Sequence, residues 1–132
     1  MADARVDAAY RCPGGSVDAK YDVHATMDAH NTTSKAVIID SATADMVLAA
    51  VTGRWLEPVG DRYDAGAVIV SPSTVPANST AKLQVTIPSS CSSGQYGSQQ
   101  SNSGSYTVTI YLATSAGAFN ITAGNHHEIL AA

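Results

Sequence analysis

The four histidines are the side chains of this chain best suited to hold a metal ion, because imidazole nitrogen binds both zinc and copper. His24 and His30 are six residues apart, which is about 20 Å along an extended strand and too far for both to bind one ion. His126 and His127 are adjacent and would face opposite sides of a strand. A site would need one histidine from each pair, so we expect solvated histidines and no cofactor, with a copper or zinc site as the alternative.

The two cysteines, Cys12 and Cys91, have neither C-x-x-C spacing nor a neighbouring histidine that would suggest zinc. A disulfide between them is the simplest interpretation, with two buried thiols as the alternative. Closing a loop of about 80 residues would contribute roughly 4–5 kcal/mol in the chain-entropy model. A disulfide favours an extracellular or cell-surface location. Residues 1–5 lack the features of a signal peptide, so the protein is either cytosolic or has lost its signal; we favour the second reading.

The sequence contains no familiar catalytic motif. G-x-S-x-G, H-E-x-x-H, the phosphate-binding loop and the dinucleotide-binding glycine pattern are all absent. Serine is common, but nothing distinguishes one serine as a nucleophile. We therefore expect a protein that is not an enzyme.

A candidate binding patch lies in the least regular stretch, residues 53–64, which carries a basic and an aromatic residue at each end: Arg54 with Trp55, and Arg62 with Tyr63. Such pairs are frequent in contacts with proteins and sugars. The alternative is that Trp55, the only tryptophan, belongs to the core.

Three asparagines, Asn31, Asn78 and Asn120, occur in N-x-[ST] sequences and are candidate glycosylation sites. Asn31 and Asn78 fall in predicted turns. In a bacterial host such sequences would indicate only turn formation.

Charge is distributed unevenly along the chain. The formal net charge is −4, and after residue 65 the only charged residues are Lys82 and Glu128. A neutral half must be hydrated by polar side chains, covered by glycans or packed against a partner. The absence of a basic stripe argues against nucleic acid, and no apolar run is long enough to insert into a membrane.

Apolar and polar residues alternate strictly over residues 20–31 and 81–87, which indicates half-buried strands. Residues 35–40 are interpreted as the return strand of a hairpin with 20–31, and residues 66–71 as a further strand. Pro88 is expected to end the strand at 81–87.

The remaining segments complete an all-β pattern. Residues 6–10, 106–112 and 117–129 are predicted strands, the last with a bulge or break at Gly124. Residues 45–52 are also predicted to be a strand, with a helical turn as the alternative. Residues 89–105 are expected to form a flexible Ser/Gly/Gln loop. Seven to eight strands over residues 1–132 predict one two-sheet Greek-key sandwich, with a small barrel as the runner-up.

The stretch from Asn102 through Gly104 and Tyr106 to Val108 resembles the tyrosine corner of secreted immunoglobulin-like domains. The resemblance implies a structural role for Tyr106, whose hydroxyl would bond upstream backbone. Val108 stands where antibody-type domains carry a cysteine, so the resemblance is to the broad immunoglobulin-like fold and implies no specific function.

These observations favour an extracellular structural or adhesive module that self-associates or packs against other surface proteins. The first alternative is a module that binds a glycan or protein through residues 53–64. The second is a secreted metal-binding protein.

Overall fold

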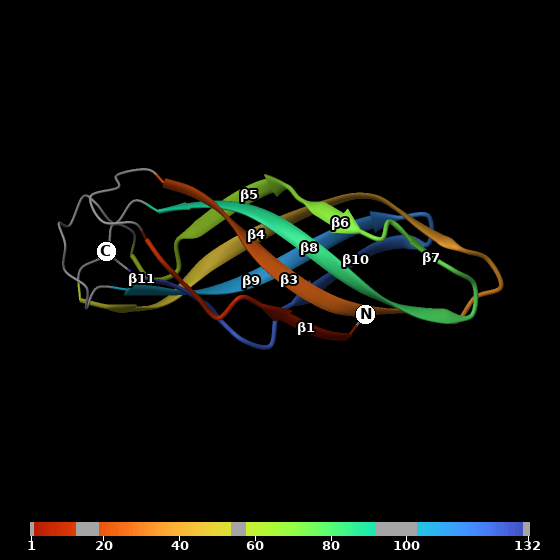
Figure 1. The fold of residues 1–132 in the computed structure, drawn as a ribbon, viewed down its shortest axis with the longest axis horizontal. Helices are drawn as coiled ribbons and strands as arrows, with labels where there is room; N and C mark the ends of the chain where they lie inside the picture. Colours follow the sequence, from red (N-terminus) through yellow and green to blue (C-terminus); the bar gives the residue numbers. More distant parts are fainter. Residues whose placement is uncertain (1, 13–18, 54–57, 92–102, 131–132) are drawn as a thin grey trace.

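The computed structural model describes residues 2–12, 19–53, 58–91 and 103–130, and within these ranges the side chains of Ala19 and Cys91 are not described. The protein is all-β, with two sheets packed face to face along one long axis (Figure 1). The described part contains no helix with the length and hydropathy needed to cross a bilayer.

The first sheet, sheet A, has four strands in the order β1-β3-β8-β6, all neighbours being antiparallel. The bounds are β1 Ala2–Val6, β3 Ala19–Asn31, β8 Ser79–Cys91 and β6 Ile69–Ser71. The two long strands β3 and β8 pair over their whole lengths, from Ala19 opposite Cys91 to Asn31 opposite Ser79.

The second sheet, sheet B, has the order β2-β11-β9-β4-β5, with β10 also paired to β9 and β7 to β4. The bounds are β2 Ala9–Arg11, β4 Val37–Thr52, β5 Arg62–Ala67, β7 Thr74–Val75, β9 Ser103–Thr114, β10 Gly117–Thr122 and β11 His127–Leu130. Strands β10 and β11 lie end to end along the same edge of β9.

The core lies between the sheets and is built by the strict alternation of side chains along the long strands. Sheet A contributes Val23, Met27, Leu83 and Ile87 among other residues, all fully buried. Sheet B contributes its own buried row, which includes Met46, Leu48, Val108 and Ile110. Burial of these side chains is the main stabilising contribution of the fold.

The beginning of the chain passes from one sheet to the other, as in immunoglobulin-like domains. Strand β1 pairs with β3 in sheet A, and two residues later β2 pairs with β11 in sheet B, in parallel orientation. The β11 side is fixed by hydrogen bonds from Glu128 N to Ala8 O and from Cys12 N to Leu130 O, both 2.9 Å. The predicted two-sheet immunoglobulin-like sandwich is confirmed.

The predicted hairpin between residues 20–31 and 35–40 is wrong. Strand β3 belongs to sheet A and β4 to sheet B, so the chain crosses between sheets at this point. The apolar runs at 35–40 and 45–52 are parts of the same strand, β4, interrupted by a register shift between Ile39 and Ser41. The inner faces of β3 and β4 therefore belong to opposite sheets and both contribute to the core between them.

Pro88 does not end its strand, contrary to expectation. It lies within β8 opposite Asp22. Backbone groups of successive strand residues point to opposite edges. Because β6 pairs only with residues 84–86 of β8, the proline nitrogen faces a stretch of edge with no paired strand among the described residues, where no N–H donor is needed.

The described residues form eleven strands, more than the seven to eight predicted, because several predicted strands are divided. Residues 66–71 are split between β5 and β6, and residues 117–129 are divided around Gly124 as predicted. Of the predicted flexible loop, residues 89–91 and 103–105 belong to strands. Residues 92–102 lie outside the described part.

Candidate functional site

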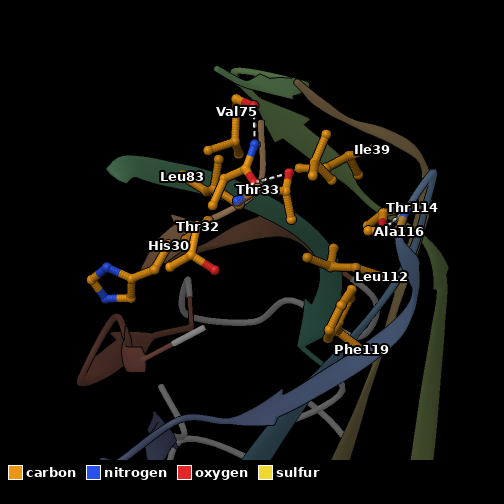
Figure 2. Close-up of a pocket in the computed structure, with 13 residues that line it drawn as sticks. His30, Thr32, Thr33, Ile39, Val75, Leu83, Leu112, Thr114, Ala116 and Phe119 are labelled. Atoms are coloured by element: carbon orange, nitrogen blue, oxygen red, sulfur yellow. Dashed lines mark hydrogen bonds between the residues drawn. The ribbon is translucent and has the colours of Figure 1, made fainter. Parts of the chain in front are cut away.

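A groove with an apolar floor opens between the two sheets, where β3 ends on one side and β10 begins on the other. We call it the lateral groove; its volume is about 280 Å³. Figure 2 shows Leu112 and Phe119 along one wall and Thr32 on the other, with the ring of His30 pointing away from the cavity. The lining residues are Ala29, His30, Asn31, Thr32, Thr33, Val37, Ile39, Val75, Leu83, Leu112, Thr114, Ala116 and Phe119.

The lining of the lateral groove contains no Asp, Glu, Lys or Arg. Its floor is core, since Leu83 is 0 % exposed and Leu112 is 3 % exposed, whereas Phe119 on the rim is 44 % exposed. Phe119 pairs with Leu112, so its side chain is on the inner face of sheet B although part of it remains in solvent. The groove is therefore a place where the interior of the sandwich is incompletely covered.

One end of the lateral groove is held by Asn31, which is 6 % exposed. Its Nδ2 donates to the carbonyl oxygens of Lys35, Val75 and Pro76 at 2.8, 3.1 and 3.1 Å. Its Oδ1 accepts from the backbone N and the hydroxyl of Thr33. A single side chain thus joins the end of β3, the following turn and the β7 segment.

The outer face of sheet B over β9 and β10 is uncharged, because residues 103–122 contain no Asp, Glu, Lys or Arg. Tyr111, 37 % exposed, stands near its centre, with Asn120 and Thr43 opposite it on the neighbouring strands. We call this surface the β9–β10 face. Its outward residues are Thr107, Thr109, Tyr111, Ala113, Ala118, Asn120 and Thr122.

The orientation of Tyr111 is fixed by Asp45 of β4. The Tyr111 hydroxyl donates to Asp45 Oδ2 at 2.9 Å, and the same oxygen lies 3.6 Å from Arg62 Nε. The hydrogen bond to the carboxylate raises the pKa of Tyr111. The ring is therefore held in place on the face rather than free to turn away.

His127 is fully buried, which contradicts the expectation of four solvated histidines. Its Nδ1 donates to the carbonyl of Asp7 at 2.7 Å, and its Nε2 accepts from the hydroxyl of Tyr21 at 2.8 Å. The ring of Tyr21 stacks on Tyr10 with centroids 3.8 Å apart. Burial lowers the pKa of His127 and raises that of Tyr21. Through these two hydrogen bonds the neutral His127 joins the segment between β1 and β2 to β3.

The other three histidines are exposed and lie in separate places. The Nδ1 atoms of His24, His30 and His126 lie within 3.2 Å of Asp7 Oδ2, Thr80 Oγ1 and Ser105 Oγ respectively. Among the residues that the structure describes, no three His, Cys, Asp or Glu side chains are grouped to hold a metal.

The candidate patch in residues 53–64 is only partly described, since Arg54 and Trp55 lie outside the described residues. Arg62 and Tyr63 are neighbours on β5 rather than in a loop. Arg62 pairs with Val47 and Tyr63 with the buried Met46, so the two side chains leave the strand on opposite faces. These two residues do not form one contact surface.

The three candidate glycosylation sites differ in accessibility. The amide of Asn31 is buried and already makes the bonds described above, so the structure argues against a glycan there. Asn78 is exposed in a turn with a positive φ of 51°. Asn120 is exposed on β10 and lies on the β9–β10 face.

The cysteines and the corner tyrosine lie in the folded body of the protein. Cys12 is 2 % exposed and Cys91 is the last residue of β8. Tyr106 is 6 % exposed on β9, where it pairs with Leu48 and His127. Its burial suits a structural role, and the hydrogen bond expected of a tyrosine corner stays a prediction.

Sequence patterns did not point to Phe119 or Tyr111. Both are single aromatic residues in alternating strands, and their exposure depends on where other strands end. The lining of the lateral groove comes from several strands that are distant in sequence. Only the scarcity of charged residues after residue 65 indicated an uncharged surface such as the β9–β10 face.

Comparisons with known proteins add little to this geometry. No family model matches the sequence, and no curated protein matches it. Among solved structures, the chain is similar to the ASH/PapD-like domain of human CEP192 (PapD-like domain 7), with 11 % identity and a TM-score of 0.33 over 98 % of this chain and 85 % of that one. At that TM-score the similarity supports no functional argument. The strand order itself identifies an all-β, immunoglobulin-like two-sheet sandwich.

Proposed function

We propose that this protein is a non-catalytic structural or adhesive module that associates with copies of itself through the β9–β10 face. The observation that carries the proposal is the uncharged outer surface of residues 103–122, with Tyr111 held in place near its centre by Asp45. Tyrosine is enriched at protein interfaces, and charged residues are depleted from their cores. Protein surfaces that must remain apart usually carry charge.

Light scattering after size-exclusion chromatography tests the proposal over a range of protein concentrations. We expect the mass of the unmodified chain to rise with concentration. Asn120→Lys places a charge on the β9–β10 face and should return the chain to a monomer. Gln84→Lys places the same charge on the outer face of sheet A and should leave the association unchanged. A clean monomer at every concentration, or equal effects of the two variants, would rule out this interface.

We also propose that the protein works outside the cell and contains a Cys12–Cys91 disulfide. Support comes from the burial of Cys12 and from the absence of a free cysteine among the described residues. A thiol titration of protein from an oxidising compartment, under denaturing conditions without reductant, should find no free thiol. Two free thiols would remove the basis for an extracellular location.

A further inference from the structure

Strand β10 has one paired edge and one open edge. It pairs with β9 over all of its residues, and no strand among the described residues pairs with its other side. The hydrogen bond from Gly124 N to Ala4 O, 2.8 Å long, is on that other side but lies beyond the end of β10. Over its own length, this edge of β10 is therefore unpaired in the part of the chain that the structure describes.

The open edge of β10 displays the backbone groups of every second residue, with Ala118 and Asn120 in the middle of the strand. Ala123 N donates to Val108 O of β9 at 2.9 Å, and backbone groups of successive strand residues point to opposite edges. The odd-numbered residues of β10 therefore bond to β9, and the even-numbered ones face away from it. Gly124 N, which donates towards β1, follows the same alternation.

Features that usually prevent strand addition are missing from β10. Natural edge strands are protected by charged side chains, prolines, short length or irregular pairing. Residues 117–122 include no charged residue and no proline, and their register with β9 is continuous. An uncharged and regular edge is a template for another strand.

The other outer strands of the described part do carry such protection. Strand β5 contains Arg62 and Asp64, and its register with β4 shifts. Strand β1 contains Arg5, and its register with β3 shifts. Strands β2, β6 and β7 have three residues or fewer. The contrast marks β10 as the described edge best suited to accept a partner strand.

We propose that the open edge of β10 pairs with the same edge of a second copy of the chain, antiparallel and around a two-fold axis beside Phe119. The inference rests on the proposed self-association and adds a second surface to it, distinct from the β9–β10 face. Around this axis, Ala118 of each copy lies opposite Asn120 of the other. These are the residues whose backbone groups face outward, so hydrogen bonds form on both sides of the axis.

The absence of charge and the position of Phe119 favour a second copy as the occupant. Near a two-fold axis each residue meets its own counterpart, so a charge there would face a like charge. Residues 117–122 carry none. Phe119 is 44 % exposed, and the axis places it against Phe119 of the second copy in a non-hydrogen-bonded pair, where side chains are closest. Aromatic pairs of this kind stabilise antiparallel sheets.

The same pairing covers the rim of the lateral groove. Phe119 forms part of one wall of this groove, on the inner face of sheet B (Figure 2). When the second copy extends sheet B, its own Phe119 lies on the same inner face. The interior of the sandwich, which a single chain covers incompletely at this point, thus gains an apolar side chain from the second copy.

A proline at the open edge tests the pairing. Asn120→Pro removes an N–H that faces the edge and no bond to β9, and proline is tolerated at such positions. Asn120→Ala is the matched control, because it removes the same side chain and keeps the N–H. Each change is combined with Tyr111→Ala, which removes the centre of the β9–β10 face and leaves the edge of β10 unchanged.

In the Tyr111→Ala chain we expect a dimer whose Kd is nearly unchanged by Asn120→Ala and is raised about tenfold or more by Asn120→Pro. The effect is large because the two-fold axis removes the N–H twice. Sedimentation equilibrium measures the Kd, and circular dichroism checks that each variant is folded. Equal Kd values for the two variants, or a monomeric Tyr111→Ala chain at every concentration, would overturn the inference.

The outcomes for the two surfaces are separable. If the unmodified chain associates and the Tyr111→Ala chain is monomeric, the β9–β10 face stands and the edge pairing is wrong. If Tyr111→Ala associates as strongly as the unmodified chain and Asn120→Pro abolishes the dimer, the edge pairing stands and the β9–β10 face is wrong.

Hydrogen exchange followed by NMR in the Tyr111→Ala chain tests the pairing without a proline. The amide of Ile121 bonds to β9 and should exchange slowly at every concentration. The amides of Ala118 and Asn120 face the open edge, and their exchange should slow by about tenfold or more once the concentration exceeds the Kd. Exchange at these two amides that does not depend on concentration contradicts the inference, because any dimer would then use another surface.

Discussion

Few polar side chains are buried in the part of the chain that the structure describes. Two of them join segments that backbone pairing leaves apart. Asn31 joins the end of β3 to the β7 segment, and His127 joins the β1–β2 passage to β3 through Asp7 and Tyr21. A buried polar group is costly unless its hydrogen bonds are made. These two residues therefore affect stability more than an exposed asparagine or histidine does.

The burial of His127 predicts a loss of stability in mild acid. Its folded pKa is lowered from the usual 6.5, so the unfolded chain binds a proton first as pH falls through about 6.5, and the free energy of unfolding decreases. Denaturant titrations between pH 8 and 5 should show this decrease in the unmodified chain and a shallower one in His127→Gln. His30→Gln, which changes an exposed histidine, should retain the full decrease; if all three proteins behave alike, His127 is not the source.

Replacing Asn31 should be strongly destabilising. Asn31→Ala leaves the carbonyls of Lys35, Val75 and Pro76 without this donor, and we expect a loss of about 2–4 kcal/mol in the free energy of unfolding. Asn120→Ala, an exposed change, should cost less than about 0.5 kcal/mol. Urea denaturation measures both, and a loss below 1 kcal/mol for Asn31→Ala would mean that water replaces its bonds.

Among the elements, the edges of the sheets determine where the protein can gain contacts. Strand β8 extends beyond β6 at both ends, and β3 extends beyond β1. The exposed edge of β8 carries Pro88, which cannot donate a hydrogen bond and so hinders strand addition there.

The orientation of Pro88 gives a prediction about proline placement. Pro88→Ala should change the free energy of unfolding by less than about 1 kcal/mol. Ser89→Pro should cost about 3 kcal/mol or more, because Ser89 lies opposite Tyr21 and its N–H points towards β3. Guanidinium unfolding of the two variants compares them directly, and similar losses would show that the edge assignment is wrong.

For the whole molecule, the alternation of apolar residues was enough to predict the sandwich, because both long strands of sheet A read as half-buried. It could not predict which strands pair. The segments at 20–31 and 35–40 look like a hairpin, and only packing across the core separates them into two sheets. The predicted strands are divided at Val68 and near Ala8 because the chain crosses from one sheet to the other at these points. No short-range sequence pattern indicates such a crossing.

The candidate surfaces were less predictable than the fold. The lateral groove is lined by residues from several strands that are distant in sequence, and no short-range pattern indicates that they come together. The neutral second half of the sequence indicated an uncharged surface such as the β9–β10 face. It did not indicate Tyr111 near the centre of that face, because the orientation of this side chain depends on Asp45, which lies 66 residues away in the chain. Glycosylation of Asn120 would cover this face, so a glycan there and self-association exclude each other.

The parallel pairing of β2 with β11 has a mechanical consequence. A force that pulls Ala2 and Leu130 apart draws β2 and β11 in opposite directions along their common axis. The reason is that the two strands are parallel, and β2 is pulled from its N-terminal end but β11 from its C-terminal end. The hydrogen bonds between them are then loaded together, in shear, instead of opening one after another. A module built in this way can transmit tension along its long axis before β2 and β11 separate.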